Sequence, residues 1–154
     1  MKIIQWIKFF WMKARKEVEK YPVIKTHLDE LMKSKLRNKI KSDTCYGYEC
    51  TDLMYFTCDY ETAKLIAKTI PIKYRKYVKT EHDCENFAIE FYALCKTLFP
   101  YLPVGYCKVN TSKGKHALNW IAYKTKSGRL SFDFIEPQTG ELMYYDYKPY
   151  YLEV

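Results

Sequence analysis

A cysteine, a histidine and a glutamate that could act together occur in the second half of the chain, at Cys84, His116 and Glu136. A cysteine is a nucleophile as its thiolate, and it needs a base to take its proton and a third group to orient that base. Cys84 follows Asp83, a residue type typical of helix N-caps. The thiol is therefore predicted at the first position of a helix, where the helix dipole favours a thiolate over a thiol.

A hairpin that turns at 125–128 would bring His116 and Glu136 together. Residues 125–128, Thr-Lys-Ser-Gly, are typical of a turn. A hairpin with this turn places His116 opposite the stretch from Glu136 to Gln138. Side chains alternate along a strand, so Glu136 and Gln138 share a face, whereas Asp133 points to the other side. We therefore expect Glu136, and not Asp133, to hold the imidazole.

The elements that must position these residues are predicted as helices followed by an antiparallel β-meander. Apolar residues at helical spacing predict a helix from residue 83 or 84 to 99, and Asp59 caps a shorter helix over about 60–70. Cys95 on the first of these helices and Cys107 in a strand are assigned to the core. Short β-rich runs separated by turn signals are predicted over 104–110, 116–123, 130–136 and 142–147.

Residues 1–41 carry all of the chain's formal charge of +8. They hold 12 Lys and Arg against 4 Asp and Glu, whereas residues 42–154 hold 14 of each. Two amphipathic helices are predicted there, over 2–20 and 26–41. We expect both to pack on residues 42–154 as part of one domain. The alternative is that this basic segment binds an anionic surface or a protein partner.

Length and composition restrict the class of protein. The 154 residues fit one domain, and a hydrophobic content of 48% is ample for a core. Six cysteines are too few for a disulfide-stapled scaffold, which favours a reducing compartment. No stretch approaches the ~18 apolar residues that a membrane span requires. The expected location is cytoplasmic, in a host cell or a virion if the protein is viral.

Three motifs occur in a fixed order: Asp83-Cys-Glu-Asn-Phe-Ala88, Lys115-His-Ala-Leu-Asn119 and Phe134-Ile-Glu-Pro-Gln-Thr-Gly140. Together they resemble the papain-like cysteine peptidase domain at the C-terminus of a mushroom agglutinin, and related stand-alone proteins of phages and bacteria. They are also similar to the wider transglutaminase-like peptidase superfamily. The resemblance covers about residues 70–141 and implies an α+β, papain-like (transglutaminase-like) fold, with residues 42–154 as the peptidase-like domain.

The resemblance implies a cysteine peptidase or amidase, a hydrolase that acts on a protein or peptide substrate. Cys84 would attack an amide carbonyl, His116 would serve as base and then acid, and Glu136 would orient the imidazole. Peptidase, amidase and transamidase share these groups and are not distinguished. Further candidates for oxyanion or substrate contacts are His82, which could equally be an exposed loop imidazole, Gln138 and Asn119.

No cofactor is expected from the residues, but the agglutinin domains are calcium-activated, and Glu85 and Asn86 after the nucleophile leave calcium dependence open. A metal-binding module of Cys45, Cys50 and Cys58, with His82 or Cys84, fits zinc spacing poorly. The main alternative is a non-catalytic papain-like interaction protein, from a phage or virus, that binds through residues 1–41.

Overall fold

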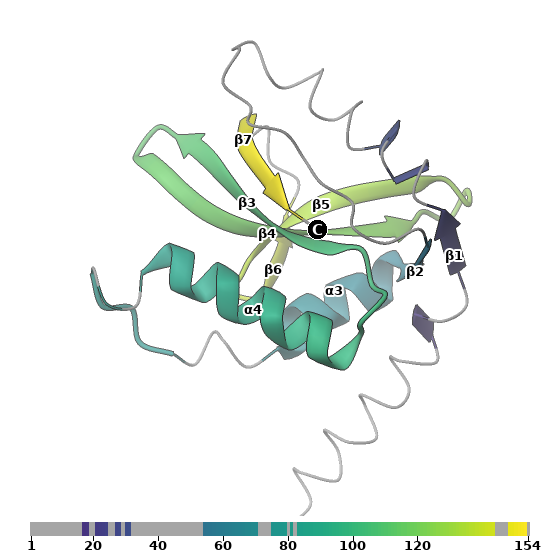
Figure 1. Ribbon diagram of the computed structural model, residues 1–154, viewed down its shortest axis with the longest axis horizontal. Coiled ribbons are helices and arrows are strands. Elements are labelled where there is room, and N and C mark those ends of the chain that lie inside the picture. The colour runs from purple at the N-terminus through teal and green to yellow at the C-terminus, as the bar shows by residue number, and fades with distance from the viewer. Residues whose placement is uncertain are drawn as a thin grey trace, which may run out of the picture.

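The structure, a computed structural model, contains one seven-stranded sheet and two helices in the residues that it describes (Figure 1). The described residues are 17–18, 21–24, 27–28, 30–31, 54–70, 75–79, 81, 83–143 and 148–153. The elements are β1 (Tyr21–Ile24), β2 (Met54–Asp59), α3 (Tyr60–Thr69), α4 (Cys84–Leu98), β3 (Val104–Thr111), β4 (Gly114–Lys124), β5 (Leu130–Glu136), β6 (Glu141–Met143) and β7 (Lys148–Glu153).

Strand β4 is the centre of the sheet. It pairs antiparallel with β3 and β5, and parallel with β2 through Cys58 and Tyr123. The sheet continues outward as β1 on β2, β7 on β3 and β6 on β5, all antiparallel. His116 on β4 and Glu136 on β5 therefore lie on neighbouring strands.

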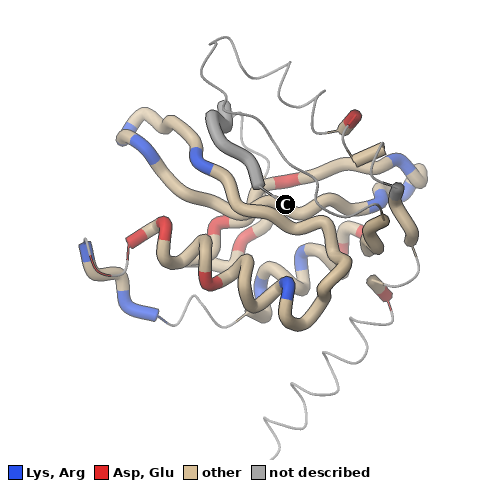
Figure 2. The backbone as a smooth tube through the Cα atoms, viewed as in Figure 1, with Lys and Arg blue, Asp and Glu red and all other residues tan. Residues whose placement is uncertain are grey.

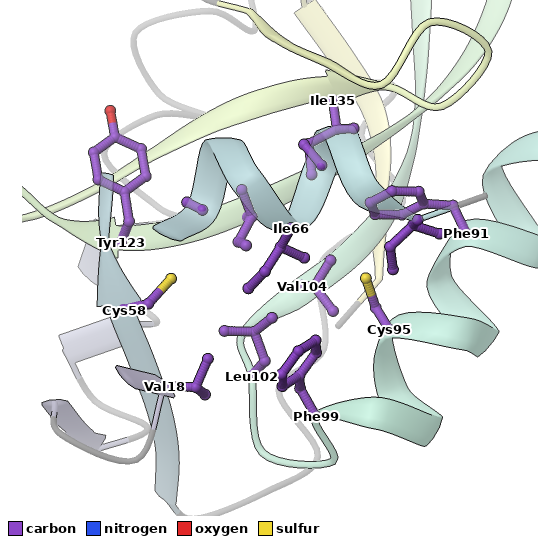
Figure 3. Packing of buried hydrophobic residues seen from close by; sticks show 14 of the residues in the cluster. Val18, Cys58, Ile66, Phe91, Cys95, Phe99, Leu102, Val104, Tyr123 and Ile135 are labelled. Carbon is purple, nitrogen blue, oxygen red and sulfur yellow. The ribbon is translucent and has the colours of Figure 1, made fainter. Parts of the chain in front are cut away.

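Helices α3 and α4 pack against the sheet through an apolar cluster on one of its faces. Helix α4 begins where Asp83 caps it and where Asn86 returns a side-chain bond to the cap, with Asn86 Oδ1 3.2 Å from the Asp83 N–H. It contacts β3 and β4, and α3 contacts β6, β4 and β2. Figure 3 shows this cluster, in which Cys58 and Cys95 are fully buried among apolar side chains.

The opposite face of the sheet carries a second core cluster. Alternation along β4 places Leu118 and Trp120 in it, whereas Ile121 lies in the cluster with the helices. Of the N-terminal segment, Val18 is buried in the helix-side cluster and Leu28 in this second one. The rest of the two helices predicted over 2–20 and 26–41 lies outside the described residues, apart from short helical pieces around these positions.

The structure corrects the predicted fold class, an α+β arrangement of N-terminal helices and an antiparallel meander. Its described part is mostly β-sheet, and the sheet is mixed. The sequence predicts no strand before residue 104, but β1 and β2 form there. The reason is that Tyr55, Phe56 and Thr57 have the aromatic and β-branched side chains that suit a half-buried strand, and β4 offers an edge to pair with.

Helices α3 and α4 and the strands β3 to β6 lie close to where the sequence predicts them. None of the described helices has the length and apolar character that crossing a membrane would need.

Candidate functional site

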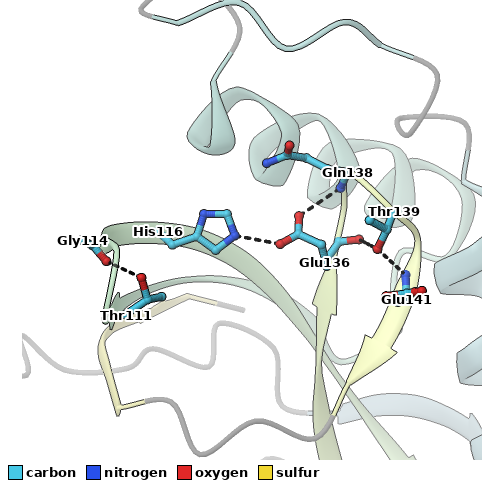
Figure 4. Close-up of polar contacts among 7 residues, drawn as sticks. All are labelled: Thr111, Gly114, His116, Glu136, Gln138, Thr139 and Glu141. Carbon is cyan, nitrogen blue, oxygen red and sulfur yellow. Dashed lines mark hydrogen bonds and ion pairs between the residues drawn. The ribbon is translucent and has the colours of Figure 1, made fainter.

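His116 on β4 and Glu136 at the end of β5 form a close pair, with Nε2 and Oε2 2.7 Å apart (Figure 4). In the β4–β5 ladder, Asn119 pairs with Ile135. If the same register is continued past the end of β5, Gln138 lies opposite His116, and Glu136 lies diagonally across from His116. The two side chains are largely buried, with 24% and 16% of their surfaces exposed. Figure 4 shows the second ring nitrogen, Nδ1, on the side of the ring away from Glu136. The imidazole is therefore held through one nitrogen and presents the other.

A turn after β5 fixes the Glu136 carboxylate. The Glu136 Oε1 accepts a hydrogen bond from the backbone N–H of Gln138 at 3.1 Å (Figure 4). The backbone carbonyl of Glu136 accepts one from the N–H of Gly140 at 2.8 Å. Gly140 has a φ of +72°, and a Cβ there would lie 2.9 Å from the carbonyl oxygen of Ala67 on α3. Only glycine fits this position without displacing the helix backbone.

Cys84 is the first residue of α4 and is half-buried. It packs against a small cluster of Ala88, Tyr106 and Ala117, and Ala117 is the residue after His116 on β4. Side chains alternate along β4, so the contact of Cys84 with Ala117 does not itself bring the thiol to the His116 ring. No hydrogen bond joins Cys84 to His116 within the described residues. The structure brings His116 and Glu136 together, and it places Cys84 at the start of α4 with no direct contact to them in the described part of the chain.

The other described cysteines differ sharply from Cys84. Cys58, Cys95 and Cys107 are fully buried, and desolvation raises the pKa of each of these thiols well above its ordinary value. They remain thiols at neutral pH, and the assignment of Cys95 and Cys107 to the core is confirmed. Among the cysteines that the structure describes, Cys84 alone is partly exposed.

An ion pair braces the start of α4 against β3. Lys108 Nζ lies 2.9 Å from Glu85 Oε1, and the hydrogen bond to Glu85 is the main cause that raises the pKa of Lys108. Lys108 therefore stays protonated through the ordinary pH range. The negative charge next to Cys84 is balanced by this contact.

The three residues predicted for oxyanion or substrate contacts, Asn119, Gln138 and His82, do not lie together in the described structure. Asn119 is fully buried, and its Nδ2 donates to the carbonyls of Ala88 at 2.9 Å and Gly105 at 3.1 Å, which makes it a tie between β4, α4 and β3. Gln138 meets Glu136 through its backbone N–H. His82 lies outside the described residues, as do Cys45 and Cys50 of the metal-module alternative. No group of three metal-ligating side chains is found in the described part of the chain.

Asp133 lies where strand alternation predicts, away from the imidazole. Its Oδ2 accepts a hydrogen bond from the Tyr123 hydroxyl at 2.9 Å. Burial and, after it, this bond raise the pKa of Tyr123 to about 12. The choice of Glu136 over Asp133 as the partner of His116 is confirmed by these two contacts.

The structure has two cavities of note, and one of them adjoins His116. The larger, about 630 Å³, lies at the start of α3 and is lined by tyrosines and charged residues that include Tyr60, Tyr123 and Glu61. It does not include Cys84, His116 or Glu136. The smaller, about 360 Å³, adjoins His116 at the end of the β3–β4 hairpin. The geometry of the His116–Glu136 pair, and not cavity size, identifies the candidate site.

No protein-family model and no curated protein sequence matches this chain. Two solved structures that share its fold are a PSL1a–E64 complex, at 20% identity and a TM-score of 0.69, and Polyporus squamosus lectin bound to the human-type influenza-binding epitope Neu5Aca2-6Galb1-4GlcNAc, at 21% and 0.67. Each alignment covers 88% of this chain and 52% or 50% of the other. The chain thus spans about half the length of these neighbours, and the likeness concerns the fold alone.

These comparisons correct the family suggested by the sequence motifs. The neighbours are described as a lectin and its complexes, and neither description names a peptidase. By this comparison the predicted membership of the papain-like, transglutaminase-like peptidases is wrong, and so is the papain-like fold assignment. The motifs misled because a cysteine at a helix start and a histidine and an acid on neighbouring strands are local features, which do not fix a fold or a family.

The functions taken from that family are overturned with it. These were a cysteine peptidase or amidase, described by the terms hydrolase, thiol protease and papain-like. The alternative of a non-catalytic interaction protein loses its papain-like assignment, and a phage or viral source stays a prediction. The second neighbour is described in complex with a glycan epitope, and neither comparison supports a peptide substrate.

Proposed function

We propose that Cys84, His116 and Glu136 form a thiol-nucleophile site, and that the chain is an enzyme that works through a covalent bond to the Cys84 sulfur. The observation that carries the proposal is the 2.7 Å contact between His116 and Glu136, and Cys84 as the first residue of α4 is the partly exposed thiol of the described chain. The proposal concerns the nucleophile and its base, and it assigns no peptide substrate.

The chemistry follows from the three groups. The Cys84 thiol gives its proton to His116 Nδ1, and the thiolate sulfur attacks an electrophilic carbon of the substrate, forming an S–C bond. The bond to the leaving group breaks, and that group takes the proton from the imidazolium. Glu136 stabilises the imidazolium and fixes the ring. Contacts between such groups are often loose before a ligand binds and tighten in the complex, which accommodates the missing hydrogen bond between Cys84 and His116.

Labelling with E64, the compound named with PSL1a, tests the proposal. Its epoxide is opened by a thiolate: an S–C bond forms, a C–O bond breaks, and the oxygen takes a proton. At pH 6 an ordinary thiol with a pKa of ~8.5 is almost entirely protonated and reacts slowly. We expect the full chain to gain the mass of one E64, assigned to Cys84 by peptide mapping.

Substitutions distinguish E64 labelling that depends on the proposed site from labelling of an ordinary exposed thiol. Cys84→Ser should abolish the adduct, and His116→Gln should slow its formation by about 100-fold or more, because the base is lost. His27→Gln, which changes an exposed histidine elsewhere, should leave the rate unchanged. An adduct that forms equally fast in His116→Gln, or no adduct at Cys84, would refute the proposal.

Binding of a glycan is a second candidate function, favoured by the description of the second neighbour. The larger cavity suits it chemically, because the rings of Tyr60 and Tyr123, 5.1 Å apart between centroids, lie with polar groups in its lining. Titration of the full chain with Neu5Acα2-6Galβ1-4GlcNAc tests this. Saturable binding that is lost in Tyr60→Ala but kept in Leu65→Ala, an exposed residue of the same helix, supports it, and absence of binding rejects it.

Three expectations from the sequence stay predictions. They are binding of an anionic surface or protein by residues 1–41, a cytoplasmic location, and the absence of a cofactor with calcium dependence left open. Salt-sensitive binding of the full chain to anionic vesicles would test the first.

A further inference from the structure

The larger cavity, about 630 Å³ in volume, lies where two parallel strands end side by side. Strands β2 and β4 run in parallel in a register that pairs Asp59 with Lys124, so their carboxyl ends meet at one edge of the sheet. There β2 leads directly into α3, and β4 leads into its turn with β5 (Figure 1). In α/β sheets, ligands bind outside such strand ends, and small-molecule cavities commonly measure roughly 300–1,000 Å³.

The walls of this cavity come almost entirely from two continuous stretches of the chain. They are Tyr21, Asp59, Tyr60, Glu61, Tyr123, Lys124, Thr125, Lys126 and Gly128. All of them except Tyr21 belong to 54–70 and 83–143, two stretches that the structure describes without a gap. The aromatic and charged groups of the walls are therefore positioned by β2, α3, β4 and the turn after β4.

Two tyrosine rings form an aromatic wall of the cavity. The ring centroids of Tyr60 and Tyr123 lie 5.1 Å apart, with the ring planes at 59°. The Tyr123 hydroxyl donates to Asp133 Oδ2 at 2.9 Å, which fixes the orientation of its ring. Tyr60 is 36% exposed. A planar apolar group can pack on such a pair face to face or edge to face, so the wall suits the aromatic group of a ligand.

Opposite charges lie on two sides of this wall. The start of α3 contributes the carboxylates of Asp59 and Glu61. The end of β4 and its turn contribute the ammonium groups of Lys124 and Lys126, and Figure 2 shows positive charge at this end of the β4–β5 hairpin. Within the described stretches no ion pair joins these carboxylates to these ammonium groups, although Asp59 and Lys124 are ladder partners.

Local hydrogen bonds hold the two charged sides in place. Asp59 Oδ1 accepts from the backbone N–H of Thr62 at 2.8 Å, which caps α3. The turn is closed by the Thr125 N–H, which donates to the Arg129 carbonyl at 2.9 Å, and by the Gly128 N–H, which donates to the Thr125 carbonyl at 2.9 Å. The cavity therefore presents carboxylates and ammonium groups on separate, fixed elements, with the aromatic wall between them.

We infer that the larger cavity binds a zwitterion with an aromatic side chain, of the class of the aromatic α-amino acids. The ammonium group of this ligand binds the carboxylates at the start of α3, its carboxylate binds the two lysines, and its ring packs on the tyrosine pair. The inference is independent of the thiol-nucleophile function, because Cys84, His116 and Glu136 do not line this cavity. It also differs from glycan binding, since a glycan without an ammonium group would leave the carboxylates unpaired.

Calorimetric titration of the full chain with L-phenylalanine tests the inference. Three analogues each lack one feature: phenylalanine amide lacks the carboxylate, N-acetylphenylalanine lacks the ammonium group, and glycine lacks the ring. We expect saturable binding of one phenylalanine per chain. Loss of either charge should weaken binding by about tenfold, because one charged hydrogen-bonding contact is removed. Glycine should show no saturable binding.

Variants at exposed positions assign each part of the ligand to a wall of the cavity. Glu61→Gln should weaken phenylalanine by about fivefold or more but leave N-acetylphenylalanine unchanged, because that analogue has no ammonium group. Lys126→Gln should weaken phenylalanine to a similar extent but leave phenylalanine amide unchanged. The matched controls Lys64→Gln and Leu65→Ala, at exposed positions of α3, should bind phenylalanine like the unsubstituted chain.

The other outcomes overturn the inference. These are no binding of phenylalanine, equal binding of phenylalanine and its amide or N-acetyl analogue, and binding that is unchanged in either Glu61→Gln or Lys126→Gln. A loss in Glu61→Gln that is as large for N-acetylphenylalanine as for phenylalanine also overturns it, since the loss would not come from the ammonium contact. Binding of Neu5Acα2-6Galβ1-4GlcNAc without binding of phenylalanine would assign the cavity to a glycan. E64 labelling of Cys84 reports on the thiol-nucleophile function separately.

Discussion

The side-chain amide of Asn119 donates a hydrogen bond to the backbone carbonyl of Ala88 at 2.9 Å, and so β4 holds α4 one turn beyond Cys84. The same amide donates to the carbonyl of Gly105 on β3. A single buried side chain thus joins the helix that carries the thiol to the strand that carries the imidazole. The relative position of these two groups depends on it.

Asn119→Ala should lower the free energy of unfolding by about 1–3 kcal/mol, because two buried carbonyls lose a donor. It should also slow the reaction of Cys84 with E64, since α4 is no longer tied to β4. Urea unfolding and the labelling rate measure the two effects. Asn110→Ala, at an exposed position of β3, is the control. Equal losses of stability and of labelling rate in both variants would show that the Asn119 hydrogen bonds do not hold α4 on β4.

Glu136→Gln should preserve the fold but slow E64 labelling by about tenfold or more, because an amide stabilises an imidazolium less than a carboxylate does. Asp133→Asn should change the rate little, since Asp133 contacts Tyr123 and not His116. The rates of adduct formation at pH 6 compare the two variants. A larger effect of Asp133→Asn would show that the imidazole is oriented in another way.

Gly140→Ala should destabilise the protein more than Gly128→Ala. Both glycines have a positive φ, +72° and +78°, so both substitutions introduce backbone strain of about 1 kcal/mol. Only at Gly140 does the new Cβ also meet the backbone of α3, whereas the space around Gly128 is open. Urea midpoints of the two variants isolate the steric part. Equal losses would mean that the turn after Glu136 does not pack tightly on α3.

Leu28→Ala should cost about 2–5 kcal/mol of unfolding free energy, because Leu28 is fully buried in the cluster that contains Trp120. Leu65→Ala, at a position 46% exposed, should cost less than about 0.5 kcal/mol. Chemical unfolding of both variants tests whether the N-terminal segment contributes to the core. A near-neutral Leu28→Ala would show that it does not.

The parts of the structure that the sequence predicts correctly depend on local rules. The start of α4 follows from Asp83 as a cap and from apolar spacing after Cys84, and both lie within two turns of helix. The His116–Glu136 pair follows from a turn signal and from alternation along two strands joined by that turn. These rules involve residues close in the chain, so a single sequence contains the information.

The parts that it misses depend on partners far away in the chain. Strand β2 forms because it pairs with β4, and no residue near Cys58 in the sequence indicates that Tyr123 is its partner. Asn119 is polar and was predicted as a ligand contact, but its role is set by the Ala88 carbonyl of another element. The family assignment failed in the same way, since it extended three local motifs to a whole fold.

The parallel pairing of β2 with β4 has a consequence for the order in which the chain folds. Strands β3 to β6 follow one another through short turns, whereas the Thr57 hydroxyl reaches the Ala122 carbonyl across 65 positions of the sequence. Closing so long a loop costs chain entropy before any contact repays it, which makes such pairings slow. We expect the amides of Val104–Glu136 to gain protection in pulsed hydrogen exchange before those of β2. The site would then be assembled from the imidazole side, with the sheet completed last.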